Sequence, residues 1–264
     1  VMNYVCRPLA EYGCGITSQK ALTRFAERGW LDVYYISLFS FGVYLYLGSP
    51  YYMQLDNLYS AWPHDEHTGL FKKYYLVTIA FWVQQFFVLN IEERRKDHYQ
   101  MFLHHVVTFC LVVGSYYYHF TRIGHLIIMI MDLVDITLDL AKMLKYLGYL
   151  KLCDLMFVVF LVSWIILRHG VYNVLFWHAW TKASDLMADG QCGAPGNNPN
   201  RRCWTPMVLD VFYALLGGLQ LMTCVLMDFI LKVAYRVVPG YGADDVRSDE
   251  DDTALEWDRC SSCG

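Results

Sequence analysis

The chain has 264 residues, of which 56% are hydrophobic and 17% are charged, and its formal net charge is -4. Soluble domains have roughly 45–50% apolar and about 25% charged residues, so this composition excludes a disordered chain, a collagen-like repeat and a secreted disulfide scaffold. Much of the acid lies between Asp244 and Asp258, and without a basic surface we expect no nucleic acid partner.

The chain begins with Val1 rather than Met, and no short apolar run with a small-residue cleavage site follows it. We therefore expect a fragment whose natural start, with room for a further N-terminal span, is missing. Residues 1–29 are expected to form a cytosolic N-terminal segment.

Six apolar runs follow, each close to the roughly 20 residues that a helix needs to cross a bilayer. They are continuously apolar and edged with Trp and Tyr, whereas a membrane β-barrel would show alternation over about 10 residues. The expected fold is all-α: a polytopic membrane protein with a six-helix bundle over residues 30–236. The predicted spans are Leu31–Gly48, Tyr74–Ile91, Met101–His119, Ile123–Leu144, Leu152–Trp177 and Met207–Leu231.

The positions of Lys and Arg predict the orientation of these spans. With a cytosolic C-terminal tail, 14 of the 21 Lys and Arg residues face the cytosol, 6 face the opposite side and Arg168 lies within a span. This distribution agrees with the positive-inside rule. The long hydrophilic loop over residues 179–206 then faces the lumen, where an oxidising compartment would permit a disulfide between Cys192 and Cys203, although spacing alone does not establish it.

Ionisable residues within spans usually mark a site, because each is costly at bilayer depth. The third span contains His104 and His105, and Thr108 lies one helical turn after His104. The helical phase favours His104, beside Thr108, over His105 as the primary residue.

The fourth span carries Asp132, Asp135 and Asp139, which share one stripe of a helix. A short turn around Phe120–Arg122 joins the third and fourth spans, so we expect antiparallel neighbours whose His and Asp side chains can meet. These residues could simply clamp two helices together. The alternative is an Asp that orients a basic His, the arrangement of a general-base or nucleophile pair. For acyl transfer, Thr108, a second protonated His or a backbone N–H could stabilise the oxyanion.

Other polar residues allow more than one interpretation. Arg168 and His169 could line a cavity or pair with an Asp of another helix. His64 and His67 lie in an external loop without a nearby set of further metal ligands, so we expect a solvated loop and no metal. Ser248 directly precedes a run of acids in the tail over residues 237–264, which we expect to be disordered, and is a predicted phosphorylation site.

Four segments together resemble the Lag motif of the TLC-domain ceramide synthases, especially their fungal branch. The double His followed by Thr and by spaced intramembrane Asp residues is the specific part of the resemblance. One departure is that many animal members have His-Asp where this chain has Met131-Asp132. The segments are Asn90–Thr108, Tyr118–Gly124, Met131–Asp135 and Ala141–Gly148.

The resemblance implies an enzyme of the endoplasmic reticulum membrane that transfers a fatty acyl group from acyl-CoA to the amine of a sphingoid base. Its catalytic residues would be His104, His105, Asp132 and Asp135, with one imidazole acting as the base or as the acyl acceptor. No cofactor is expected, since acyl-CoA is a substrate. A small single-pass accessory subunit and dimerisation are expected, beside membrane lipids. The candidates for substrate binding are Thr108, Asp139, Arg168, His169, Arg95 and Lys142, the last two at the cytosolic edge where CoA would arrive.

Three other classes fit less well. A non-enzymatic TLC-type lipid sensor or translocon-associated protein would not need the complete His and Asp set. A di-iron hydroxylase would need repeated His-rich boxes, which are missing. A proton-coupled transporter would show an inverted repeat, and the hydropathy has none.

Overall fold

A computed structural model describes residues 5–8, 10–11, 19–64, 67–91, 98–194 and 202–237. Within this part the chain is helical, and an isolated bridge between Gln191 and Trp204 is the one extended pairing. The main helices are α1 (Gln19–Leu47), α2 (Gly69–Ile91), α3 (His98–Tyr117), α4 (Thr121–Tyr146), α5 (Leu150–Trp164), α6 (Tyr172–Leu186) and α7 (Pro206–Val237). Three short elements are η3 (Asp56–Leu58), η4 (Ile165–Val171) and η5 (Ala188–Gly190).

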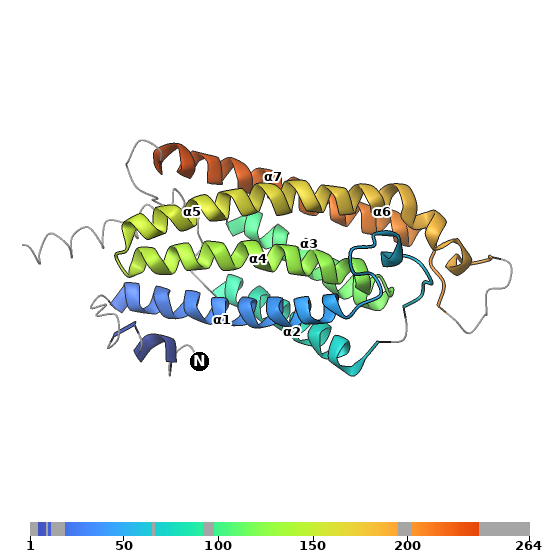
Figure 1. The fold of residues 1–264 in the computed structure, drawn as a ribbon, viewed down its shortest axis with the longest axis horizontal. Helices are drawn as coiled ribbons and strands as arrows, with labels where there is room; N and C mark the ends of the chain where they lie inside the picture. The colour runs from blue at the N-terminus through green and yellow to red at the C-terminus, as the bar shows by residue number, and fades with distance from the viewer. Residues whose placement is uncertain are drawn as a thin grey trace, which may run out of the picture. The chain divides into compact units, whose positions relative to one another are not determined.

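The helices match the six predicted spans in number and order, since α5, η4 and α6 follow one another without a break (Figure 1). Among the described residues, four helical segments are long and apolar enough to cross a membrane: Ala21–Leu47, Gly69–Ile91, Leu150–Leu186 and Pro206–Lys232. The other two helices, α3 and α4, carry the predicted polar residues. The chain is an all-helical polytopic membrane protein.

Local sequence signals set several helix ends. Thr68 accepts a hydrogen bond from the backbone N–H of Phe71 at the start of α2 (3.3 Å), as an N-cap residue does. Pro206 is the first residue of α7. The N–H groups of the first turn have no partner within a helix, so proline loses no helical hydrogen bond at this position. Gly148, with φ of +80°, follows the end of α4, and its N–H binds the Lys145 carbonyl (3.0 Å).

Several helices extend further than predicted, and α1 and α6 do so by the largest margins. Helix α1 begins at Gln19 rather than near residue 31. Its first turns are polar, and the prediction is based on the apolar run that follows them. Helix α6 continues to Leu186, so the predicted loop over residues 179–206 begins later than expected. Hydropathy marks the part of a helix that suits hydrocarbon, whereas backbone hydrogen bonding continues beyond it.

The described chain divides into two compact units. The first contains the described residues up to Ser37, Asp132–Ile165 and those from Val225 onward; the second contains Leu38–Met131 and Ile166–Cys224. Helices α2 and α3 belong entirely to the second unit, whereas α1, α4 and α7 contribute residues to both.

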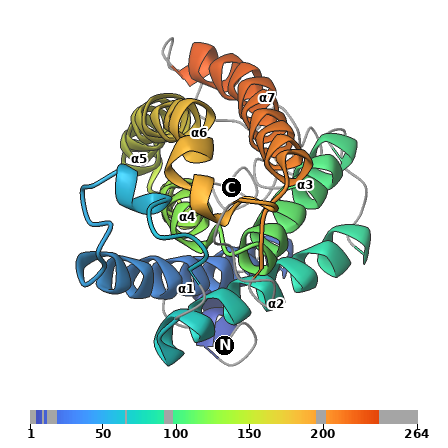
Figure 2. The same ribbon diagram turned by 90° about the vertical axis from the view of Figure 1, so that its right-hand side faces the viewer.

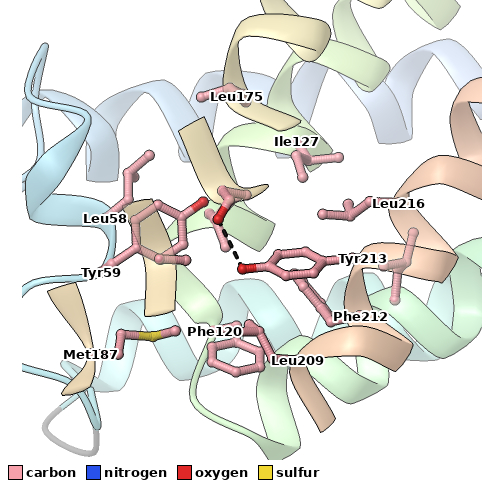
Figure 3. Close-up of a cluster of buried hydrophobic side chains, with 14 of the residues drawn as sticks. Leu58, Tyr59, Phe120, Ile127, Leu175, Met187, Leu209, Phe212, Tyr213 and Leu216 are labelled. Atoms are coloured by element: carbon pink, nitrogen blue, oxygen red, sulfur yellow. Dashed lines mark hydrogen bonds between the residues drawn. The ribbon is translucent and has the colours of Figure 1, made fainter. Parts of the chain in front are cut away.

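The second unit holds a large apolar core formed by α6, the first half of α7 and the start of α4 (Figure 3). Two buried tyrosines stabilise the pairing of α6 with α7. Tyr213 donates a hydrogen bond to the Ala179 carbonyl (2.9 Å) and Tyr172 donates one to the Leu216 carbonyl (2.8 Å). Such bonds satisfy polar groups that lipid cannot hydrate. The first unit has a smaller core of Ala10, Leu22 and Phe25 with Met143, Tyr146 and Leu147.

The segment after α6 is held close to the second unit's core. A disulfide joins Cys192 to Cys203, and the Cys192 N–H donates to the Trp204 carbonyl (2.9 Å). The buried Trp204 indole donates to the Met187 carbonyl (2.8 Å). Gly190 lies against Trp62, and a Cβ at this position would overlap the indole ring.

The expectation of a solvated His64 is wrong. Its side chain is buried in the loop between α1 and α2, with Nε2 2.9 Å from the Ser60 carbonyl and Nδ1 3.2 Å from the His119 carbonyl. Burial and, to a lesser degree, the charge of Arg122 lower the pKa of His64 to about 4. The loop folds back onto the α3–α4 turn, a contact that local hydrophilicity does not reveal.

This burial predicts a loss of stability in acid. Below a pH of about 6.5 the unfolded chain protonates His64 and the folded chain does not, so stability falls until the pH reaches about 4 and then levels off. The contribution is at most about 3 kcal/mol. Thermal unfolding in detergent should therefore depend less on pH in His64→Asn than in the wild type between these values. Equal pH dependence of the two proteins would contradict the prediction.

Candidate active site

The two predicted histidines, His104 and His105, lie in the middle of α3 and are called the histidine pair below. Their spacing along the helix points the two rings in directions about 100° apart. His104 shares its face with Thr108, one turn later. His104 Nδ1 and Thr108 Oγ1 are both enclosed and have no hydrogen-bond partner in the described structure. Because enclosed polar groups are normally paired, this face of α3 is suited to a polar ligand.

His105 is buried and its orientation is fixed. Its Nδ1 lies 2.7 Å from the Met101 carbonyl, one turn earlier in α3. A carbonyl can only accept a hydrogen bond, so Nδ1 carries the hydrogen of the neutral ring. The lone pair is then on Nε2, which can accept a proton.

Trp82 of α2 contacts both members of the histidine pair. Helices α2 and α3 lie side by side (Figure 2), and the indole meets the two imidazoles edge to face, with centroid distances of 6.1 Å to His104 and 5.4 Å to His105. The indole thus limits the rotation of both rings and keeps water from one side of them.

A cationic group also belongs to this site. Arg168 is buried, its Nη2 donates to the Met131 carbonyl (3.3 Å), and its positive charge acts on His104. It belongs to the π-helical turn η4, a rare element that often occurs at functional sites. In the next position, His169 accepts a hydrogen bond at Nδ1 from Gln220 of α7 (3.0 Å).

Three carboxylates of the first unit form a second polar group. Asp132, Asp135 and Asp139 are on one side of the continuous helix α4 and are called the acidic stripe below. Asp132 and Asp139 are buried and Asp135 is half-buried. Arg28 of α1 donates from Nη1 to Asp139 Oδ1 (3.1 Å). Met131, whose carbonyl binds Arg168, directly precedes Asp132 in the chain.

The side chains of this site include the kinds of group that acyl transfer uses. The histidine pair offers a nitrogen base and a nucleophile, Arg168 offers a fixed positive charge, and Thr108 offers a hydroxyl. A preorganised cation and donor of this kind stabilise charge that develops on a carbonyl oxygen. A sequence model of the family described as the TLC domain matches residues 24–232, which include all of these side chains.

The chain belongs to the TLC domain family.

Several relatives of this TLC domain carry names that describe an activity. It is 38% identical over 96% of its length to the sphingosine N-acyltransferase-like protein ALT7 of Alternaria alternata and 39% identical over 95% to the sphingosine N-acyltransferase lag1 of Schizosaccharomyces pombe. It is 32% identical over 95% to the ceramide synthase LAG1 of Saccharomyces cerevisiae. The chain spans 63%, 63% and 60% of the length of these relatives, respectively.

The predicted site residues of this TLC domain are divided between the two units. The second unit gathers His104, His105, Thr108, Arg168 and His169. The first unit holds the acidic stripe and Lys142, which is half-buried. A contact between the histidine pair and the acidic stripe stays a prediction. Arg95 and Ser248 lie outside the described residues.

Sequence reasoning missed Trp82, Gln220 and the partnership of Arg28 with Asp139. Each joins segments far apart in the chain. A polar residue inside an apolar run is the available signal for Gln220, while a tryptophan in a span is too common to indicate a site.

Proposed function

We propose that this TLC domain is the catalytic part of a sphingoid base N-acyltransferase, which transfers a fatty acyl group from acyl-CoA to the amine of a long-chain base. The observation that carries the proposal is the enclosed, unpartnered pair of His104 Nδ1 and Thr108 Oγ1 beside Arg168. The names of the relatives support the substrate class.

The reaction requires a base and a site for negative charge. The sphingoid base arrives as an ammonium and loses one proton to an imidazole. Its nitrogen then forms a bond to the acyl carbon, and the bond from carbon to sulfur breaks. The second amine proton is lost as the amide forms, and CoA leaves as a thiol after gaining a proton. One proton is released overall.

The hydrogen bond of His105 to Met101 supports assigning the base to His105 Nε2. His104, near Thr108 and Arg168, is then the candidate acyl acceptor if the reaction has two steps. Arg168 and the Thr108 hydroxyl would stabilise the carbonyl oxygen as it becomes negative. We assign Asp132 and Asp135 to stabilising the imidazolium, as a carboxylate does for a catalytic histidine.

The proposal includes the setting of the reaction. The protein would lie in the endoplasmic reticulum membrane with its C-terminus in the cytosol. CoA would approach from the cytosolic edge, near Arg95 and Lys142, and the acyl chain would extend between helices toward the lumen. A small single-pass subunit and a second copy of the chain are the proposed partners, and Ser248 is the proposed phosphorylation site.

Purified full-length protein in liposomes, supplied with acyl-CoA, sphinganine and accessory subunit, tests the function. We expect equal amounts of ceramide, measured by mass spectrometry, and of free CoA, measured with a thiol reagent. Neither product would form if the protein were a lipid sensor or a translocon-associated protein, and that result would refute the proposal. CoA release without ceramide would refute the amine as acceptor.

A further inference from the structure

Asp32 of α1 is a buried carboxylate that the reaction proposed above does not use. Its side chain is 4% exposed, and both carboxylate oxygens are enclosed without a hydrogen-bond partner in the described structure. A buried carboxylate normally has a cation or several donors beside it, because its removal from water costs several kcal/mol. Asp32 therefore lacks a partner that its position requires.

Charged residues of both signs act on Asp32. Arg28, one turn earlier in α1, makes its ion pair with Asp139 of the acidic stripe, and the charges of both residues act on Asp32. Tyr35, one turn later, lies within electrostatic range of all three carboxylates of the acidic stripe. Among Asp32, Asp139 and Arg28, two carboxylates thus share one guanidinium.

A metal ion is a poor explanation for this cluster. Among the residues that the structure describes, no group of His, Cys, Asp and Glu has an arrangement that could hold a metal ion. An organic cation places weaker demands on geometry than a metal does, since an ammonium group can donate three hydrogen bonds in different directions.

We infer that Asp32 receives the ammonium group of the sphingoid base when this substrate docks. The inference rests on the proposed function and names a residue that positions one of its two substrates. The ammonium supplies the positive charge and the N–H donors that the Asp32 oxygens lack, and the charge of Asp139 acts on the same position.

The test compares Asp32→Asn with the wild type as full-length proteins with the accessory subunit. The matched control is Asp228→Asn, which makes the same chemical change at an exposed carboxylate of α7. We expect the KM for sphinganine to rise by about thirtyfold or more in Asp32→Asn, the usual scale for losing one partner of a buried charge pair. The KM for acyl-CoA should change by less than about twofold.

Equilibrium binding separates charge recognition from general support of the site. The wild type should bind sphinganine more tightly than an analogue in which a hydroxyl replaces the amine, and Asp32→Asn should lose this preference. Equal weakening of both ligands would overturn the inference, as would an unchanged KM for sphinganine. If Asp32→Asn does not fold, Asp32→Glu is measured in its place, because this substitution keeps the negative charge but moves it. An unchanged KM for sphinganine in Asp32→Glu also overturns the inference.

Wild-type activity keeps the two proposals distinguishable. A wild type that makes ceramide, combined with an Asp32→Asn variant of unchanged KM for sphinganine, refutes the role of Asp32 and leaves the proposed function intact. A wild type that makes no ceramide refutes the proposed function. In that case a preference for the amine over the hydroxyl analogue, lost in Asp32→Asn, would still support an ammonium site.

Discussion

Replacing His105 by alanine should lower the rate of ceramide formation by about a thousandfold, within the range that a positioned base contributes. The Met101 carbonyl fixes the hydrogen on His105 Nδ1, so Nε2 is left to take the proton from the amine. The rate of ceramide formation at saturating substrate checks this. His98→Ala, at the start of the same helix, is the matched control and should retain most activity.

His104→Ala, measured beside His105→Ala and the wild type, separates the one-step route from the two-step route. After rapid quenching with acyl-CoA alone, intact-mass measurement should find an acyl adduct in the wild type and in His105→Ala but not in His104→Ala if the acyl group first binds His104. An adduct missing from all three proteins would show that the amine attacks the thioester directly. Activity of His105→Ala within about tenfold of the wild type would contradict the role of His105 as base in either route.

Replacing Arg168 by methionine should lower kcat by about 10²–10³-fold, the loss typical of removing one group that stabilises an oxyanion. Methionine keeps much of the side-chain volume in the buried site but removes the positive charge that acts on His104. Arg168→Lys keeps the charge without the planar guanidinium and should recover part of the rate. The measurement is kcat with the KM for each substrate.

Arg202→Met is the matched control for this substitution, since Arg202 is exposed and donates to the Tyr117 carbonyl. Size-exclusion chromatography of each variant reports whether it folds. A folded Arg168→Met protein with kcat within about threefold of the wild type would show that Arg168 takes no part in the reaction. Its role would then be to support the packing of η4 against the Met131 carbonyl.

Much of the fold was accessible from the sequence because its signals are local. Length and continuous apolarity predict helices in a membrane, and the described structure has them in the predicted order. The spacing of Asp132, Asp135 and Asp139 places them on one side of α4 wherever that helix lies. Helix ends were less accurate, because α1 and α6 continue past their apolar parts.

The sequence alone determined that this chain is a polytopic helical protein with a histidine pair in one span and an acidic stripe in the next. Only the tertiary structure decided which distant side chains stand beside them. Trp82 contacts the histidine pair from another helix, the charge of Arg168 acts on His104, and Asp32 is enclosed where the charge of Asp139 acts on it. Periodicity and hydropathy depend on neighbours in the chain, whereas these contacts depend on how helices far apart in the sequence pack together.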